Sequence, residues 1–225
     1  MKPKIISLNV GKPAYIAYNG KTVSTGINKT STAERLFLSA TNFDGDGQAD
    51  LKHHGGPDKA VCVYCIEHYP YWERELQREM GLGAFGENLT VTGLTEPTVH
   101  IGDTFLLGEA VVQISQPRQP CFKLAVKYGV PDMPVKVQNT GYTGYYFRVL
   151  EEGYVSKESR LTRLAADGGG ISVEFANRIM HHDKENMDGV RRILAVTALS
   201  ASWRATFEKR LVGMETDTKA RLIGE

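Results

Sequence analysis

The residue best suited to reactive or metal-binding chemistry is Cys121, which follows a strand-like apolar run and a turn that contains two prolines. The prolines restrict the backbone of this turn, because each fixes φ and lacks an N–H donor. Arg118 and Lys123 lie close to Cys121 in the sequence. Cations near a thiol favour the thiolate, which attacks electrophiles and binds metals. The sequence therefore predicts a functional cysteine, against the alternative of a buried thiol that only fills space.

A glycine-rich loop, with the sequence Lys-His-His-Gly-Gly-Pro-Asp-Lys at 52–59, is the second candidate. Exposed backbone N–H groups beside an imidazole and an ammonium group can hold a phosphate. His54 and Gly55 are the residues of this loop that we assign to such a site. An ordinary solvated loop would have the same composition.

Other patterns in the sequence are weaker candidates for metal-binding or catalytic sites. The oxygen-bearing residues at 42–50 imitate part of a calcium loop, but the closing position is His53 instead of Glu. Cys62 and Cys65 form a C-x-x-C pair within a strand-like run, where they would point to opposite faces and pack in the core. A nucleophile elbow, a P-loop and a dinucleotide fingerprint are all missing from the sequence, although a pairing of His54 with Cys121 in a hydrolase stays open.

Composition narrows the class of protein. The 225 residues carry a net charge of +1, which argues against a general nucleic-acid binder, since these are usually strongly basic. Three cysteines give no disulfide framework, and we see neither a signal peptide nor a membrane-spanning run. We therefore expect a cytoplasmic protein without a membrane or a stable nucleic-acid partner.

The elements that must position these residues are mainly β in the first two thirds of the chain. The pattern predicts strands at 5–10 and 60–65, the latter fully apolar and therefore internal. Hairpins are predicted around Asn19-Gly20, around Gly108-Glu109 and between 145–150 and 154–156. A helix is predicted over 67–80. Many short strands at close spacing favour a barrel.

The pattern changes near residue 165. The run Asp-Gly-Gly-Gly at 167–170 predicts a flexible joint, followed by three short helices capped by Ser172, Asp188 and Ser200. We therefore predict a β-barrel domain over 1–166 and a small helical domain over 167–225.

Several of these segments together resemble the MOSC family, the domain type found at the C-terminus of molybdenum-cofactor sulfurases. They are His-Gly-Gly-Pro-Asp-Lys-Ala at 54–60, Phe-Gly-Glu-Asn-Leu at 85–89 and Ser-Gln-Pro-Arg-x-Pro-Cys-x-Lys-Leu at 115–124. The similarity is to the YiiM type and extends through the three-helix region. It implies a mainly β fold, a MOSC-type β-barrel with a few helices, followed by a small C-terminal α-helical bundle.

The resemblance also implies a cofactor and a reaction. Cys121 matches the family's functional cysteine, which ligates molybdenum in relatives that reduce N-hydroxylated compounds. The implied cofactor is the molybdenum cofactor, a molybdopterin, and the implied substrates are N-hydroxylated purines and similar base analogues. Three cysteines are too few to hold an iron–sulfur cluster, which needs about four. Electrons would therefore come from a separate flavin or iron–sulfur protein.

A molybdopterin carries a phosphate, so the site would need fixed positive charge. The candidate cofactor-binding residues are Lys21, Lys29, Thr30, His54, Gly55, Asn88, Ser115 and Arg118. Arg118 offers a planar fork suited to a phosphate. Two alternatives stay open: Cys121 as a persulfide that carries sulfur, and a carrier of the cofactor without catalysis.

Overall fold

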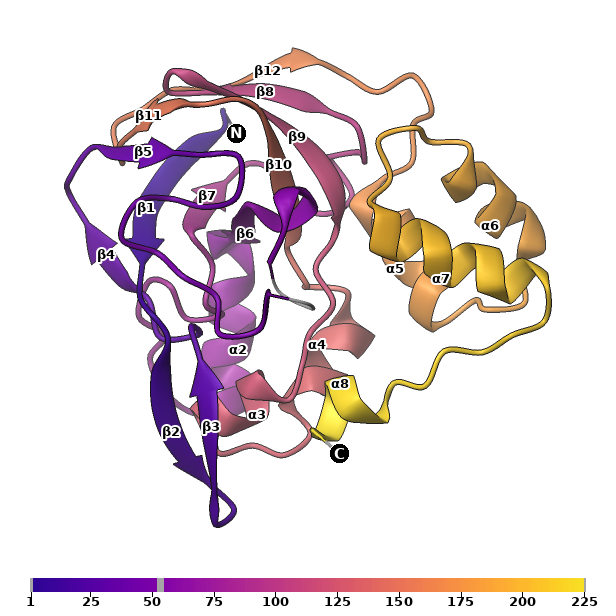
Figure 1. Cartoon of the computed structure of the whole chain (residues 1–225), viewed down its shortest axis with the longest axis horizontal. Helices are drawn as coiled ribbons and strands as arrows, with labels where there is room; N and C mark the ends of the chain where they lie inside the picture. Colours follow the sequence, from indigo (N-terminus) through magenta and orange to yellow (C-terminus); the bar gives the residue numbers. More distant parts are fainter. Residues whose placement is uncertain (1, 52–54, 225) are drawn as a thin grey trace.

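The computed structural model describes residues 2–51 and 55–224, and it is built on one large mixed sheet (Figure 1). The order of its eight strands is β12-β8-β9-β10-β6-β7-β1-β4. The strands are β1 (Lys4–Val10), β4 (Thr30–Thr32), β6 (Val61–Cys65), β7 (Leu89–Thr92), β8 (Thr104–Leu107), β9 (Ala110–Pro117), β10 (Tyr145–Glu151) and β12 (Leu161–Ala165). Neighbours run antiparallel except β6 and β7. The sheet curls into a half-barrel whose edge strands, β12 and β4, remain apart in this order, so the mainly β prediction is confirmed.

Two of the three predicted hairpins are confirmed. Strands β2 (Ala14–Tyr18) and β3 (Lys21–Thr25) pair across Asn19 and Gly20, whose φ values of 49° and 72° are those of a type I′ turn. Strands β8 and β9 pair across Gly108, which also has a positive φ. In both turns, the residues that tolerate a left-handed backbone stand where the turn needs them.

The third predicted hairpin is wrong. Strand β11 (Gly153–Val155) pairs with β5 (Leu36–Leu38), while β10 lies between β9 and β6. Because both edges of β10 are already occupied, the chain after it must find another partner. Local sequence alone contains no information about that distant partner.

Helices at one end of the sheet carry and support the segment around Cys121. The helix predicted over 67–80 is shorter: α2 spans Tyr69–Leu76 after the 3₁₀ turn η2 (Ile66–His68), and it ends because Gln77 adopts a left-handed φ of 51°. Helices α3 (Lys123–Tyr128) and α4 (Met133–Thr140) follow Cys121 and end at glycines with positive φ. The 3₁₀ turn η1 (Pro57–Lys59) precedes β6.

The C-terminal region contains α5 (Val173–His181), α6 (Met187–Leu194), α7 (Ala201–Leu211) and the short α8 (Lys219–Ile223). Ser172 and Ser200 cap α5 and α7 as predicted, since their side chains accept hydrogen bonds from Phe175 and Trp203 N–H. The predicted cap at Asp188 is wrong, because Asn186 caps α6 instead. In Figure 1, α5, α6 and α7 stand beside the sheet, whereas α8 lies back against α4.

Three apolar clusters hold these parts together. The largest fills the concave side of the sheet, and another joins α2, α3 and α4 around Trp72 and Phe85. The cluster among α5, α6 and α7 includes Ile101 from the first part of the chain. Polar contacts add to this junction, since Asp58 pairs with Arg148 of β10 and accepts a hydrogen bond from Ala201 N–H. The boundary near residue 166 stays a prediction. Among the described helices, none is long and apolar enough to cross a membrane.

Candidate functional site

Cys121 lies between the end of β9 and the start of α3, at the meeting point of two cavities. A small inner cavity of about 70 Å³ extends toward the half-barrel, and a cleft of about 600 Å³ lies between the sheet and the C-terminal helices. Cys121, Lys59, Lys123 and Tyr146 line both. The size of the cleft suits a small organic molecule, for which cavities of roughly 300–1,000 Å³ are typical.

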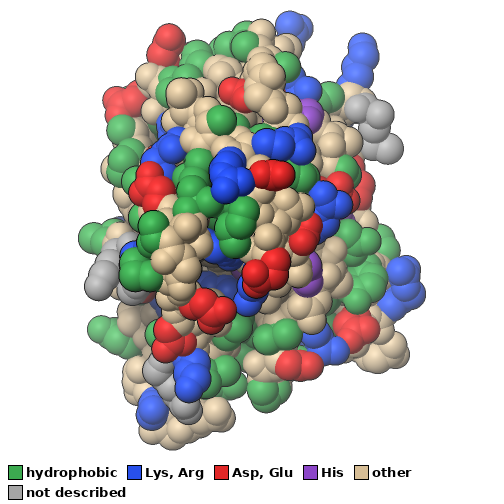
Figure 2. Space-filling view, turned by 90° about the vertical axis from the view of Figure 1, so that its right-hand side faces the viewer, with side chains coloured by type: hydrophobic (Ala, Val, Ile, Leu, Met, Phe, Trp, Pro, Cys, Tyr) green, Lys and Arg blue, Asp and Glu red, His purple; other side chains and the backbone are tan. Residues whose placement is uncertain are grey.

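The face of the molecule that carries the C-terminal helices is hollowed in its middle (Figure 2). Lys and Arg side chains lie at the bottom of the hollow, and acidic side chains stand at its rim. Glu185, Glu215 and Asp217 are acidic residues of the cleft lining, while Lys123 and Arg221 are among its basic ones. The cleft is therefore most positive in its interior.

Two cations beside Cys121 carry most of the argument. Arg118 and Lys123 are only 8% and 9% exposed and both line the inner cavity. In the part of the chain that the structure describes, neither the guanidinium of Arg118 nor the ammonium of Lys123 has a hydrogen-bond acceptor or an ion-pair partner. Burying a charge without a partner is costly, so such groups are usually compensated by a ligand of opposite charge. The arrangement indicates an anion-binding site.

A network of buried polar groups forms the far wall of the inner cavity. Asp46 forms an ion pair with Lys29, and its carboxylate also accepts hydrogen bonds from Gly11 N–H at 3.0 Å and from Asn88 Nδ2 at 2.8 Å. The Asn88 side chain also accepts a hydrogen bond from Cys62 N–H at 3.0 Å. Asn88 thus joins the 44–47 turn to strand β6 and fixes the position of Lys29.

Burial dominates the electrostatics of the thiol. Cys121 is 6% exposed, and burial raises its pKa, although Arg118, the Lys123 N–H group, the Lys123 charge and Arg221 all oppose the rise. The sequence predicted a partly ionised thiol, and that prediction is wrong for the protein without a ligand. The cations are present, but desolvation has the larger effect. A bound metal ion would supply the missing stabilisation of the thiolate.

The structure brings together four of the residues that the sequence predicted. Cys121, Arg118, Lys29 and Asn88 all line the inner cavity. The exposed Lys21 and Thr30 line neither cavity, since Lys21 lies at the tip of the β2–β3 hairpin and Thr30 begins β4.

The remaining predicted residues do not line either cavity or lie outside the described part of the chain. Ser115 lines neither cavity; its hydroxyl donates to the carbonyls of Asp58 at 2.5 Å and Tyr146 at 3.2 Å, which fixes η1 against β10. Gly55 lies against Leu51 and also stands outside both linings. His54 lies outside the described residues.

Sequence reasoning missed several residues of the cavities. Cys62 was assigned to the core, but it faces the inner cavity, while Cys65 on the opposite face of β6 joins the core. Lys59 lies within the Gly-Gly-Pro-Asp-Lys segment, and its pKa is lowered by burial, with Asp58 and Asp50 opposing. The alternation along β6 and the position of Lys59 within the motif were signals that could have found both. Tyr146 had no such signal.

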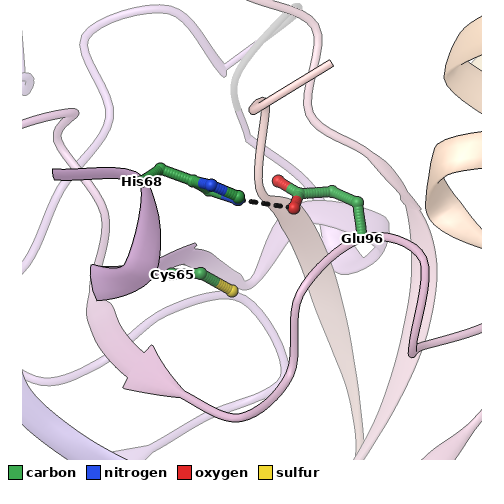
Figure 3. Close-up of side chains that lie close together, drawn as sticks. All are labelled: Cys65, His68 and Glu96. Carbon is green, nitrogen blue, oxygen red and sulfur yellow. Dashed lines mark hydrogen bonds and ion pairs between the residues drawn. The ribbon is translucent and has the colours of Figure 1, made fainter. Parts of the chain in front are cut away.

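A second cluster of side chains that could hold a metal ion is buried in the core (Figure 3). The ligand atoms of Cys65, His68 and Glu96 all lie within 4.8 Å of one another and are buried. His68 Nε2 lies 2.6 Å from the Glu96 carboxylate, which also accepts a hydrogen bond from Gly144 N–H. The Cys65 thiol donates to Leu94 O at 3.1 Å. Each group already has a partner, so the cluster braces the turn at Gly144, whose carbonyl in turn accepts a hydrogen bond from Arg118 N–H.

Comparison with known families matches this geometry to a described domain. The MOSC domain matches residues 50–162, which include η1, β6 to β10, α2 to α4 and Cys121. The chain belongs to the MOSC family. A second model, the YiiM-like 3-alpha helix domain, matches residues 171–213, which contain α5, α6 and α7. The MOSC chain is therefore of the type that continues into three helices.

Individual relatives agree with this assignment. The chain is 60% identical to the uncharacterized protein YflK of Bacillus subtilis over 92% of this chain and 93% of that protein. It is 39% identical to protein YiiM of Escherichia coli over 99% of this chain and 96% of that one. The crystal structure of YiiM from Geobacillus stearothermophilus superposes with a TM-score of 0.80 at 42% identity, covering 93% of this MOSC chain and 99% of that one.

A longer relative carries a functional name. A protein of Gibberella moniliformis named "Reductase" is 37% identical over 149 residues, which cover 64% of this MOSC chain and 26% of that protein. The similarity thus concerns about a quarter of the fungal protein.

The molybdenum cofactor of the MOSC family fits the residues of this site. It requires a sulfur donor and a place for a phosphate, and Cys121 and the unpartnered cations Arg118 and Lys123 offer both within one cavity system. Thiolate sulfur is a suitable donor for a soft metal centre.

Proposed function

We propose that the chain binds a molybdenum cofactor in the cleft and reduces N-hydroxylated purines and related base analogues to the amino compounds. The observation that carries this proposal is the position of Cys121 between two buried cations that lack partners among the described residues. The membership in the MOSC family and the similarity to a protein named "Reductase" support it.

The residues would divide the binding between them. Cys121 would ligate the metal, and Arg118 and Lys123 would hold the phosphate of the cofactor, where the Arg118 fork can make two parallel hydrogen bonds. Lys29, whose charge is balanced by Asp46, would add a hydrogen-bond donor to the lining of the same cavity. Asp46 holds Lys29 in place before the ligand arrives, so this residue would need little reorganisation on binding.

The bound cofactor would supply two-electron redox chemistry at the metal. The overall reaction consumes two electrons and two protons, breaks the N–O bond and releases the amine and water. The protein would orient the substrate in the 600 Å³ cleft and exclude bulk water from the buried sulfur. Burial raises the pKa of Tyr146, so this phenol stays protonated beside Cys121 and can donate a hydrogen bond.

Electrons would have to come from another protein. The chain's three cysteines are spread over β6 and the β9–α3 turn, and each is a free thiol. A separate flavin or iron–sulfur protein is therefore the proposed donor.

An activity assay tests this proposal. Protein produced in a host that synthesises molybdopterin should reduce 6-hydroxylaminopurine to adenine when reduced viologen replaces the natural donor. Arg118→Gln should raise KM or lower cofactor content, because it removes a cation from the cavity, while the exposed Lys21→Gln should behave like the parent. Absence of turnover by cofactor-loaded protein with reduced viologen would leave the chain as a cofactor carrier.

A further inference from the structure

The C-terminal segment, residues 213–224, lies across the cleft and next to Cys121, although the matched helical domain ends at residue 213. In Figure 1 this segment leaves α7, crosses the open side of the molecule and ends in α8 beside α4. Eight of its residues line the cleft, among them Met214, Thr218 and Arg221. The segment is therefore part of the wall that separates Cys121 from solvent.

Arg221 makes the contacts that hold this segment. Its guanidinium donates to Pro120 O at 2.6 Å and to Gln138 Oε1 at 2.9 Å. Its own carbonyl accepts a hydrogen bond from Phe122 N–H at 2.7 Å. Pro120 and Phe122 are the two residues that flank Cys121 in the chain. One residue thus fixes both chain neighbours of the functional thiol.

The rest of the segment is weakly attached. Helix α8 has five residues and buries none of them, and residues 212–220 are exposed. Gly224 adds a contact, because a Cβ placed there would lie 3.0 Å from the Phe122 ring. Segments held by few buried contacts open more easily than the core, and the hydrogen bonds of Arg221 are the main polar contacts that hold this one against the Cys121 turn.

We propose that residues 213–224 form a latch over the functional cleft, with Arg221 as the positioning residue that fastens it to both neighbours of Cys121. The closed latch holds the Cys121 turn in one geometry and covers the cleft. The open latch admits a molecule as large as the cleft. The proposal concerns access to a thiol and does not depend on the identity of the cofactor.

Labelling of Cys121 by two uncharged maleimides of different size tests the latch in the cofactor-free full-length protein. N-ethylmaleimide and N-(1-pyrenyl)maleimide react with the same thiolate, so the ratio of their rates cancels any change in ionisation. Arg221→Ala should raise the large-to-small ratio at Cys121 about tenfold, because two hydrogen bonds from a charged donor are lost. Gln138→Ala, which removes one acceptor, should give a smaller rise.

Control variants distinguish opening of the latch from destabilisation of the whole protein. Lys219→Ala removes an exposed cation from the same helix and should leave the ratio unchanged. Cys65, which is fully buried in β6, should stay unlabelled in every variant when the peptides are mapped by mass spectrometry. Arg221→Lys keeps a cationic donor attached to the segment and should hold the ratio closer to that of the parent than Arg221→Ala does. An unchanged ratio in Arg221→Ala, or an equal rise in Lys219→Ala, overturns the proposal.

Discussion

Single residues decide what the inner cavity can bind, and Arg118 shows this most clearly. Arg118 is 8% exposed and its guanidinium has no acceptor among the described residues, whereas Arg148, another arginine of the same sheet region, is paired with Asp58. A buried cation without a partner destabilises the protein unless a ligand compensates it. We therefore expect a bound anion at this site to stabilise the protein.

Replacement of Arg118 should reveal this cost. We expect Arg118→Met to raise the free energy of unfolding of the cofactor-free protein by about 1–3 kcal/mol, because the unpaired buried charge is removed. Arg148→Met should lower it, because Asp58 then loses its partner. Urea denaturation of both variants and the parent measures the two effects. An Arg118→Met variant that is as destabilised as Arg148→Met would show that Arg118 is already compensated within the protein.

The residues around Cys121 also show what the sequence could and could not predict. The motif found Cys121, Arg118 and Asn88, because their types and order are specific. It could not predict the pKa of the thiol, because burial of Cys121 depends on how α3 and α8 pack around it. These two helices are far apart in the sequence. Lys21 looked as suitable as Lys29, but only Lys29 meets Asp46.

At the scale of elements, local signals and distant pairing had different outcomes. Asn19-Gly20, Ser172 and Ser200 act through their own backbone neighbours, so their turns and caps were predictable. The pairing of β11 with β5 joins segments more than a hundred residues apart and left no local trace. Helix α2 ends early at Gln77, a residue type that gave no stop signal.

The end of α5 yields a prediction about pH. His181 borders the cleft, and its Nε2 is buried without a partner among the described residues. Burial, with Arg221 and other nearby cations adding to it, lowers the pKa of His181 to about 3. The unfolded chain therefore binds this proton between about pH 6.5 and 3 while the folded protein does not, and stability should fall as the pH falls through this window.

A variant isolates this contribution. His181→Gln should flatten the pH dependence of the free energy of unfolding between pH 6.5 and 4, because the group that takes up the proton is gone. The adjacent, exposed His182→Gln is the matched control and should keep the parent slope. Denaturation series at several pH values measure the slopes. Equal slopes for all three proteins would assign the acid sensitivity to other groups.

At the scale of the whole molecule, the site exists only where three parts meet. The half-barrel supplies Asn88 and Cys62, the β9–α3 turn supplies Cys121, and the C-terminal region supplies the outer wall of the cleft. Residues 167–170, which the sequence predicted as a flexible joint, connect the sheet to the C-terminal helices. Hydrogen bonds also join these two parts directly, from Ser200 N–H to Ser115 O and from Ala201 N–H to the Asp58 carboxylate. The sequence predicted the sheet and the helices separately, whereas the cleft forms only when they pack together.

The most direct test of the central claim is the molybdenum content of purified protein from a host that makes molybdopterin. We expect about one molybdenum per chain in the parent and in Cys62→Ala, since thiolate ligation is assigned to Cys121. Cys121→Ala should contain almost none, although it removes a thiol from the same cavity as the control does. Equal molybdenum in Cys121→Ala and Cys62→Ala would contradict the assignment of Cys121 as the metal ligand.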